Sequence, residues 1–319
     1  MLTSAALHAA ADTIDRFMPP TPTMRWPLLD ERVGMPVWVK HENHNPTGAF
    51  KVRGGLRYLA RSQVEDDSPT GIVSASRGNH AQSLAFAGAA FRTPVVIVVP
   101  EGNSPDKDAA TRAMGAEVVV HGKDFQSSLE HAYGLARERG YTLVPPFHQW
   151  LLEGVATYAA ELYNSVPGLD TVYVPVGMGT GICANISVRD LFECDTEIVG
   201  VVAAKAPAYA LSFEYGALAT TPTAATFVDG VACRVPDPAA LDIILRGASR
   251  FITVSEQEAA EAMVLMYRCT HNLAEPAGSL ALAGLLKDRE QASGKKVAVV
   301  HTGGNVDFDV LAGAFAACE

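Results

Sequence analysis

Short apolar runs rich in β-branched residues alternate with longer Ala- and Leu-rich stretches along almost the whole chain. The runs have the length of β-strands, and the stretches have the length and composition of helices. The predicted strands lie at residues 36–40, 71–75, 94–99, 117–120, 171–176, 197–202, 251–254 and 297–301. The predicted helices lie at residues 78–91, 107–114, 125–139, 155–164, 182–192, 256–270 and 280–288. Because near-continuous apolar strands that alternate with helices are typical of parallel sheets covered on both faces, the pattern predicts an α/β fold.

The length of the chain limits how many domains this pattern can form. With 319 residues, of which 48% are hydrophobic, the chain can form one large or two medium domains with a substantial core. No Pro-, Gly- or Ser-rich linker divides it, so two domains would require the chain to cross between them more than once. Residues 217–226 show little pattern and are predicted to form a surface loop.

Charge and cysteine content exclude several classes of protein. The formal net charge of −10 gives no reason to expect nucleic acid or an anionic membrane as a partner. No apolar run reaches the roughly 18 residues of a membrane span, and Asp12 and Asp15 favour an amphipathic helix opened by Thr3 or Ser4 over a signal peptide. The five cysteines lack CxxC spacing, which indicates reduced thiols rather than disulfides or a zinc site. We therefore expect a cytoplasmic protein without a bound metal.

Four glycine-marked segments lie at strand ends or turns, where open α/β sheets bind ligands. Lys51 ends the segment 45–51 and follows its Pro-Thr-Gly turn after two further residues. A lysine there is either an ordinary surface residue or, if desolvated, a nucleophile or base near neutral pH. Ser76 opens the segment 76–82 and is expected to be the N-cap of a helix whose first N–H groups could hold a carboxylate. An ordinary capped turn explains this second segment equally well.

The other two segments follow later strands. Residues 177–181 carry three glycines between a predicted strand and a predicted helix, so their N–H groups could converge on an anion such as phosphate. The GK[ST] ending of a Walker loop is missing, and no acidic residue closes the next strand, which argues against NAD. Thr302, in the segment 301–305, offers one hydroxyl at the end of the last predicted strand. Each segment alone could be a purely structural turn.

Taken together and in this order, the segments resemble the fold-type II pyridoxal-phosphate enzymes, and within them the serine/threonine dehydratase (threonine ammonia-lyase) family. The resemblance extends from about Pro20 to Asp307, and its carriers are residues 46–55, 76–82, 115–118, 177–181, 275–279 and 302–305. It implies a tryptophan-synthase-β-like α/β fold of two open parallel-sheet domains with the cofactor in the crevice between them. It further implies a large domain of residues 1–41 and 146–319, a small domain of residues 42–145 and, by analogy, a homodimer.

The resemblance also assigns roles to individual residues. It implies that Lys51 forms the Schiff base with pyridoxal 5′-phosphate and then acts as the base at the substrate Cα. The residues implied to bind the cofactor are Lys51, Phe50, Asn79, Gly177, Met178, Gly179, Thr180, Gly181 and Thr302. Those implied to bind the substrate are Ser76, Arg77, Gly78, Asn79 and His80. Because Thr302 would be a neutral partner of the pyridine nitrogen, the resemblance favours β-elimination over transamination.

The implied activity is an α,β-elimination on a small β-hydroxy amino acid such as L-threonine or L-serine, which yields a 2-oxo acid and ammonia. Dehydration of 3-hydroxyaspartate, racemisation of an amino acid and β-replacement remain alternatives within the same fold. A binding or regulatory protein that keeps the fold without the cofactor is the alternative from another class.

Three departures from the family pattern bear on these expectations. Arg77 stands where similar dehydratases carry a small residue, and a permanently charged arginine is a poor base, so weak racemisation is expected. Arg77 would either attract a second substrate carboxylate or point outward into a surface ion pair. Residues 200–204 read Gly-Val-Val-Ala-Ala and lack the glutamate that helps bind a structural Mg²⁺ or Ca²⁺ in many relatives, which argues against that cation. Residues 153–157 replace the common Gly-Gln-Gly-Thr, so the helix there should persist with different N-terminal contacts.

Overall fold

The computed structural model describes residues 2–65 and 68–318, which divide into two compact units. The large unit contains the residues up to Ser4, Pro20–Ala49 and the residues from Ala156 onward, and the small unit contains Ala5–Pro19 and Phe50–Val155. These limits differ from the expected domains, 1–41 with 146–319 and 42–145, because Ile14 and Leu151 are part of the small unit's apolar core. The domain assignment made from the sequence remains a prediction.

The large unit is built on a six-stranded sheet in the part of the chain that the structure describes. Its strands, in spatial order, are β1 (Thr23–Arg25), β2 (Val37–His41), β10 (Val297–His301), β7 (Thr171–Pro175), β8 (Glu197–Ala203) and β9 (Arg250–Val254). The edge strand β1 is antiparallel to β2, and every other neighbouring pair is parallel. The register aligns His301, the last residue of β10, with His41, the last residue of β2. The carboxyl ends of these strands therefore lie at one edge of the sheet.

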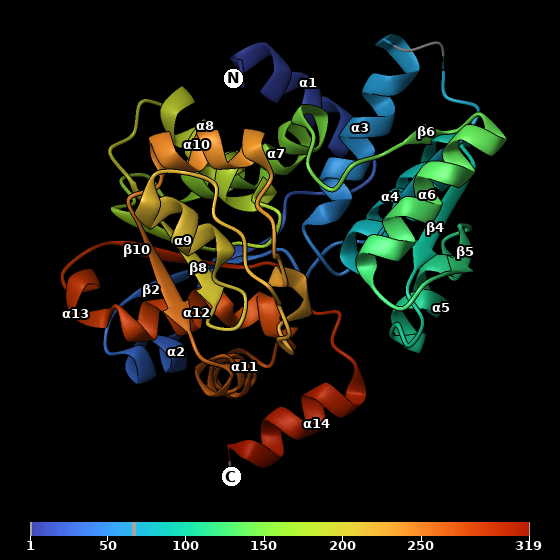
Figure 1. Ribbon diagram of the computed structural model, residues 1–319. Helices are drawn as coiled ribbons and strands as arrows, with labels where there is room; N and C mark the ends of the chain where they lie inside the picture. The colour runs from blue at the N-terminus through green and yellow to red at the C-terminus, as the bar shows by residue number, and fades with distance from the viewer. Residues whose placement is uncertain (1, 66–67, 319) are drawn as a thin grey trace. The chain divides into compact units, whose positions relative to one another are not determined.

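Helices cover both faces of this sheet. The helices of this unit are α2 (Pro27–Val33), α8 (Thr180–Leu191), α9 (Ala208–Tyr215), the 3₁₀ turn η1 (Asp229–Val231), α10 (Pro238–Gly247), α11 (Glu256–Thr270), α12 (Pro276–Lys287), α13 (Arg289–Ala292) and α14 (Phe308–Ala317). Helix α12 packs along β7, β8, β9 and β10 and is backed by α11, whereas α8 packs on β7 and β8 from the other side (Figure 1). This arrangement explains why β7 and β10 are buried over their whole length.

The small unit has a wholly parallel sheet of its own. Its described strands, in spatial order, are β5 (Glu117–Val120), β4 (Val95–Val99), β3 (Ile72–Ala75) and β6 (Thr142–Leu143). Its helices are α1 (Ser4–Ile14), α3 (Lys51–Glu65), α4 (Asn79–Phe91), α5 (Pro105–Ala113) and α6 (Phe125–Arg139). Helix α7 (Gln149–Ser165) begins in the small unit and ends in the large one. The predicted α/β fold with parallel sheets is confirmed.

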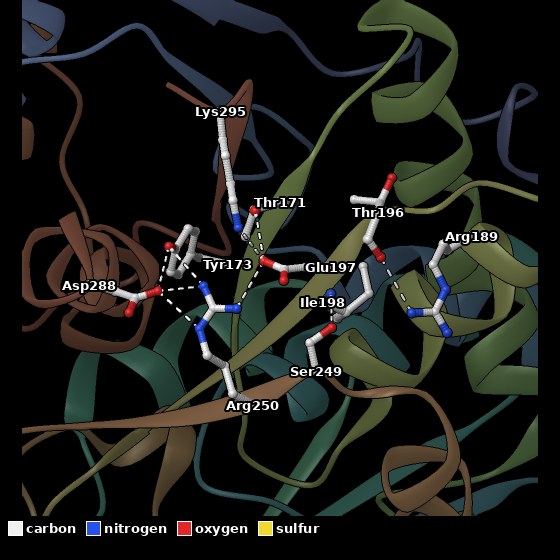
Figure 2. Close-up of polar contacts among 10 residues, drawn as sticks. All are labelled: Thr171, Tyr173, Arg189, Thr196, Glu197, Ile198, Ser249, Arg250, Asp288 and Lys295. Atoms are coloured by element: carbon white, nitrogen blue, oxygen red, sulfur yellow. Dashed lines mark hydrogen bonds and ion pairs between the residues drawn. The ribbon is translucent and has the colours of Figure 1, made fainter. Parts of the chain in front are cut away.

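Charged residues tie together the amino ends of the large unit's strands. The Arg250 guanidinium lies between two carboxylates, 2.5 Å from Asp288 and 3.0 Å from Glu197 (Figure 2). The Lys295 ammonium is 2.9 Å from Glu197, and the Tyr173 hydroxyl donates to Asp288 at 2.8 Å. The hydrogen bond from Lys295 and those from Arg250 outweigh burial and lower the pKa of Glu197. The network stabilises the sheet edge opposite the carboxyl ends, so it is separate from the segments expected to bind ligands.

Glycines bring the helices of the small unit unusually close together. A Cβ on Gly154 of α7 would overlap the backbone carbonyl of Arg53 in α3. A Cβ on Gly55 of α3 would lie 2.7 Å from the carbonyl oxygen of Ser83 in α4. Such contacts are too short for any side chain, so α3 can pack on both neighbours only because glycine occupies these positions.

Replacing Gly154 by alanine is therefore expected to lower the free energy of unfolding by about 2 kcal/mol or more, since the methyl group must force two helices apart. Gly134 in α6 is a matched control, because it is exposed and a Cβ added there would meet nothing within 4 Å. Gly134→Ala should instead raise stability by about 0.5–1 kcal/mol through helix propensity. Urea unfolding of both variants measures the difference, and similar values for the two would contradict the packing explanation.

Candidate active site

Lys51 is the first residue of α3 and is half-buried in the small unit. Its ammonium lies 5.0 Å from the centre of the Phe50 ring, and its backbone carbonyl accepts a hydrogen bond of 2.5 Å from the Ser83 hydroxyl. Burial lowers the pKa of Lys51 to about 8. A lysine with such a pKa is unprotonated to about one tenth at pH 7, and this form can attack a carbonyl group or accept a proton.

The segment between β3 and α4 presents a helix start. Gly78 is the N-cap residue of α4, so the expectation that Ser76 holds that position is wrong by two residues. The Ser76 hydroxyl nevertheless accepts hydrogen bonds from the N–H groups of Gly78, at 3.3 Å, and Ala81, at 3.2 Å. The helix therefore begins two residues later than expected, and the serine supports its start from outside the helix. A helix start of this kind favours an anion.

His80 is buried in the first turn of α4. Burial and the nearby charge of Lys51 lower the pKa of His80 to about 3, so its imidazole is neutral at physiological pH. Its Nε2 atom has no hydrogen-bond partner among the described residues. The charge of Lys51 thus acts on His80, and both of these predicted site residues belong to the small unit.

Arg77 is exposed and turned toward the loop between β4 and α5. Its Nε atom donates to Asn103 Oδ1 at 3.3 Å, while Asn103 Nδ2 donates back to the Arg77 carbonyl at 3.3 Å. Asn103 Nδ2 also donates to Asp108 Oδ1 at 2.6 Å. Of the two alternatives given for Arg77, the described structure shows the outward one, with a hydrogen bond to the Asn103 amide instead of an ion pair.

The glycine segment 177–181 of the large unit joins β7 to α8. Gly179 is the N-cap residue of α8 in a left-handed conformation, with φ of 89°. The Thr180 hydroxyl is buried and has no hydrogen-bond partner among the described residues. In the same part of the chain, the N–H groups of Gly177, Met178 and Gly179 donate to no backbone carbonyl. A buried segment with unused donors at a helix start fits the phosphate group of a ligand.

Residues far away in the sequence hold this glycine segment in place. The Tyr209 hydroxyl of α9 donates to the Met178 carbonyl at 3.2 Å. A Cβ on Gly177 would overlap the carbonyl of Gly230, and a Cβ on Gly179 would lie 2.8 Å from that of Ala240. Sequence reasoning missed Tyr209 and Gly230, because nothing in their local sequence marks them as neighbours of residues 177–181.

The segment after β10 is bound to the residues that precede Lys51. Ala49 and Gly303 form an isolated antiparallel bridge, and Gly304 N donates to the Gly48 carbonyl at 2.9 Å. Thr302 is buried, and its hydroxyl donates to the Ala277 carbonyl at 3.3 Å, which leaves its oxygen able to accept. The turn that leads along the chain into Phe50 and Lys51 is therefore fixed by the segment that contains Thr302.

Two neutral histidines lie beside this segment, at the ends of β2 and β10. The Trp26 indole N–H donates to His41 Nε2 at 2.9 Å, so that atom must be an acceptor and His41 carries its proton on Nδ1. The rings of His41 and His301 are 5.5 Å apart. Burial is the main cause that lowers the pKa of His41 to about 4 and that of His301 to about 3.

These low values predict that the protein loses stability in mild acid. The unfolded chain takes up protons at its histidines as the pH falls through about 6.5, whereas folded His41, His80 and His301 stay neutral until about pH 4 to 3. The free energy of unfolding should be flat above pH 7 and fall by roughly 2 kcal/mol per histidine by pH 5. Urea unfolding at pH 7.5 and 5.0 measures the fall. It should shrink in His301→Asn and stay unchanged in a variant at the exposed His8.

Other features of the described residues concern metals, membranes and thiols. Within residues 2–65 and 68–318, no three His, Cys, Asp or Glu side chains are grouped so as to hold a metal ion. None of the described helices combines the length and the apolar character needed to cross a membrane. All five cysteines are free. His148 packs edge-on against Trp150 and Tyr58.

Two glycine-marked helix starts, a half-buried lysine of lowered pKa and parallel sheets suit an enzyme that holds a phosphorylated aldehyde cofactor. The chain belongs to the family of pyridoxal-phosphate dependent enzymes, whose sequence pattern matches residues 14–303.

The relatives that this chain resembles within the family include ammonia-lyases and a threonine deaminase. The chain is 34% identical to an L-threonine ammonia-lyase of Geobacter sulfurreducens, over 98% of this chain and 77% of the relative. It is 32% identical to an L-threo-3-hydroxyaspartate ammonia-lyase of a Pseudomonas species, over 95% of both chains. Among solved structures, the processed form of threonine deaminase isoform 2 from Solanum lycopersicum matches with a TM-score of 0.89 and 26% identity, over 99% of this chain and 94% of that one.

Proposed function

We propose that the protein is a pyridoxal-phosphate dependent ammonia-lyase that converts a small β-hydroxy amino acid, L-threonine or L-serine, into a 2-oxo acid and ammonium. The observation that carries the proposal is Lys51, a lysine at a helix start whose pKa is lowered to about 8. The match of residues 14–303 to the family and the identity to an L-threonine ammonia-lyase support the same activity.

Residues of each unit, considered separately, suit one part of the cofactor. The unpartnered Thr180 hydroxyl and the free N–H groups of Gly177, Met178 and Gly179 suit its phosphate, and Gly181 completes this segment. Lys51 with Phe50 and Asn79 would hold the remainder, and Thr302 would contact the ring nitrogen. When bound, pyridoxal phosphate supplies an aldehyde for an amine and an electron-withdrawing ring that accepts the electron pair left at Cα.

The proposed reaction requires a base and an anion site from the protein. Lys51, unprotonated in part near neutral pH, takes the Cα proton, and the Cβ–OH bond breaks with loss of water. The enamine set free takes up one water and releases ammonium, so that threonine gives 2-oxobutanoate and serine gives pyruvate. The segment Ser76 to His80, at the N-terminus of α4, would hold the substrate carboxylate through its N–H groups.

Thr302 would influence how strongly the cofactor ring withdraws electrons from the substrate Cα, which is its strength as an electron sink. A hydroxyl is neutral, so it does not keep a ring nitrogen protonated as a carboxylate would. Thr302 is buried, and its hydroxyl, which donates to the Ala277 carbonyl at 3.3 Å, would turn to donate to that nitrogen. A weaker electron sink suits elimination better than transamination.

The test is an assay of the purified protein with its cofactor on serine, threonine, both 3-hydroxyaspartate diastereomers, phenylserine and diaminopropionate. We expect a 2-oxo acid and ammonium in equal amounts from threonine or serine without any added nucleophile. Product formed only with an added thiol or indole would indicate β-replacement. Loss of optical purity without release of a 2-oxo acid would indicate a racemase. No cofactor absorbance after reconstitution would refute the whole proposal.

A second candidate substrate is 3-hydroxyaspartate. The Pseudomonas relative that acts on it matches this chain over 95% of both lengths, and Arg77 adds a positive charge beside the proposed substrate segment. Against it, Arg77 is exposed and already hydrogen-bonded to Asn103. Threonine or serine is therefore the preferred substrate.

Replacing Arg77 by alanine distinguishes the two substrates. If threonine is the substrate, kcat/KM should change less than about twofold, because an exposed arginine contributes little. If a second carboxylate pairs with Arg77, kcat/KM for 3-hydroxyaspartate should fall about tenfold or more, the value of a charge-assisted hydrogen bond. Arg112→Ala, at an exposed arginine of α5, is the control. Equal losses on both substrates would exclude a role of Arg77 in choosing between them.

A cytoplasmic homodimer is the remaining part of the proposal, and it is supported by the resemblance alone. Sedimentation equilibrium of the purified protein would decide the oligomeric state.

A further inference from the structure

The end of β8 lacks the ligands of a divalent cation. Val202, Ala203 and Ala204 follow one another there, and none has a side-chain oxygen, whereas Mg²⁺ and Ca²⁺ require carboxylate or carbonyl oxygens. The described residues contain no group of acidic, histidine or cysteine side chains able to hold a metal. The structural cation implied by the family resemblance does not fit these residues. The charged side chain at this place is Lys205.

Lys205 is paired with the first residue of α11. Its ammonium lies 3.4 Å from Glu256 Oε2. The same carboxylate accepts a hydrogen bond of 2.5 Å from the Thr226 hydroxyl and one of 3.3 Å from Phe227 N. One carboxylate thus receives donors from the residues after β8 and from the irregular segment before η1.

The segment that Glu256 holds is irregular and is fixed by single contacts, among them the hydrogen bonds from Thr221 N to the Arg234 carbonyl and from Ala219 N to the Ser212 hydroxyl. Residues 217–228 form neither helix nor strand, and half of them are exposed. A surface hollow of about 520 Å³ separates part of this segment from the end of β8, and it is lined by Ala204, Lys205, Pro207, Thr221, Pro222, Thr223 and Ala225. The hydrogen bonds to Glu256 anchor the end of the segment nearest η1.

This anchor is close in sequence to the contact that supports the glycine segment. Gly230 follows Phe227 by three residues, and its carbonyl lies so close to Gly177 that a Cβ on Gly177 would overlap it. The next residue, Val231, is buried in the core of the large unit. Val228, which is buried in the same core, lies between Phe227 and Gly230, so this core contact and the bonds of Glu256 together position the chain that packs on Gly177.

We propose that the Lys205 ammonium, paired with Glu256, takes the place of a structural divalent cation in this protein. It supplies the positive charge that joins the end of β8 to residues 217–228 and thereby supports the glycine segment. The protein consequently needs no divalent cation for its stability. Only the effect on cofactor binding rests on the proposed function, because the ordering of residues 217–228 is independent of it.

The test compares Lys205→Gln, which removes the charge, with Lys205→Arg, which keeps it. Lys287→Gln is the matched control. Lys287, at the end of α12, forms a similar ion pair of 3.2 Å with Glu258, which lies in α11 as Glu256 does. Thermolysin digestion of the protein without cofactor, followed by mass spectrometry, measures cleavage before the exposed Leu218. We expect about fivefold faster cleavage in Lys205→Gln than in wild type, Lys205→Arg or Lys287→Gln.

Each variant is also measured with EDTA and with added Mg²⁺ or Ca²⁺. We expect EDTA to leave the thermal unfolding and the cleavage rate of the wild type unchanged. Destabilisation by EDTA, a rise of the melting temperature with either cation, or equal cleavage of Lys205→Gln and Lys287→Gln would overturn the inference. The dissociation constant of pyridoxal phosphate should rise about two- to fivefold in Lys205→Gln, as expected for the loss of one partly exposed ion pair. If the wild type binds no cofactor, the proposed function fails while the cleavage result still decides the inference.

Discussion

Replacing Lys51 by alanine is expected to lower kcat for threonine or serine by about four orders of magnitude or more, while the protein stays folded. The proposed function gives this one side chain two tasks, covalent attachment of the cofactor and transfer of the Cα proton. An alanine can perform neither task. The loss of both at once explains the size of the expected effect.

Folding should survive because the contacts of Lys51 that organise the helix start belong to its backbone. The Lys51 carbonyl accepts from the Ser83 hydroxyl, and alanine keeps that carbonyl and favours a helix. The substitution also removes a desolvated amine, so we expect the free energy of unfolding to change by about 1 kcal/mol or less.

Two further variants separate charge from proton transfer. Lys51→Arg keeps the positive charge but cannot lose its proton, so it should be as inactive as Lys51→Ala. Lys123→Ala, at an exposed lysine of the same unit, should keep full activity. The measurements are 2-oxo acid release, the absorbance of the bound cofactor and urea unfolding. A Lys51→Ala variant that retains more than about one per cent of activity would contradict the role assigned to Lys51.

The lowered pKa of Lys51 can be tested on the protein without cofactor. With a pKa of about 8, half of the amine is unprotonated at pH 8. An ordinary lysine, with a pKa near 10.4, is unprotonated to less than about 1% at that pH. Amine-reactive labelling followed by mass spectrometry should therefore modify Lys51 faster than Lys123 at pH 8. Slower modification of Lys51 would show that access, rather than protonation, limits its reactivity.

The fold could be predicted well where burial on both faces leaves a continuous apolar run. Strands at 117–120 and 297–301 and helices at 125–139 and 256–270 have the predicted bounds. The last of these begins with a capping box between Ser255 and Glu258, a local signal that fixes the first residue of a helix. The predicted irregular loop at 217–226 is also confirmed.

Elements that depend on a distant partner were missed. Strands β1 and β6 have three and two residues, too few to show a period, and they exist because β2 and β3 offer them an edge. Helices α2, α9, α10, α13 and α14 were not predicted either. Helix α7 extends six residues before its predicted start at residue 155, because Gly154 packs directly on Arg53.

The candidate site shows the same limit. Lys51, Ser76 and the segment 177–181 could be found because glycines and short polar residues mark strand ends. Tyr209, Gly230 and Ser83 could not, since each acts through one contact with a residue far away in the sequence. The lowered pKa values of Lys51 and His80 could not be predicted from the sequence either, because burial in the folded chain causes them.

The second large effect is expected at Gly179, the N-cap of α8. Replacing it by alanine imposes a left-handed conformation on a residue with a side chain, at a cost of about 1–2 kcal/mol. The new Cβ would also lie 2.8 Å from that of Ala240 and 3.1 Å from the Tyr209 hydroxyl, so the segment must move. Because Tyr209 holds the Met178 carbonyl, that movement displaces the N–H groups proposed to bind phosphate.

The control is Gly216→Ala, at the C-cap of α9. Gly216 has a φ of 65°, similar to the 89° of Gly179, but a Cβ there would meet nothing within 4 Å. Both variants therefore carry the cost of the left-handed conformation, and only Gly179→Ala carries the crowding. The difference between them isolates the displacement of the segment.

We expect Gly179→Ala to raise the dissociation constant of pyridoxal phosphate about 100-fold, the value of one or two charge-assisted hydrogen bonds. Gly216→Ala should leave that constant unchanged while both variants lose stability. Equilibrium dialysis gives the constant, and urea unfolding of the protein without cofactor gives the stability. If Gly179→Ala loses stability but binds the cofactor as tightly as Gly216→Ala does, the phosphate is held elsewhere. The free N–H groups and the buried Thr180 hydroxyl would then need another ligand.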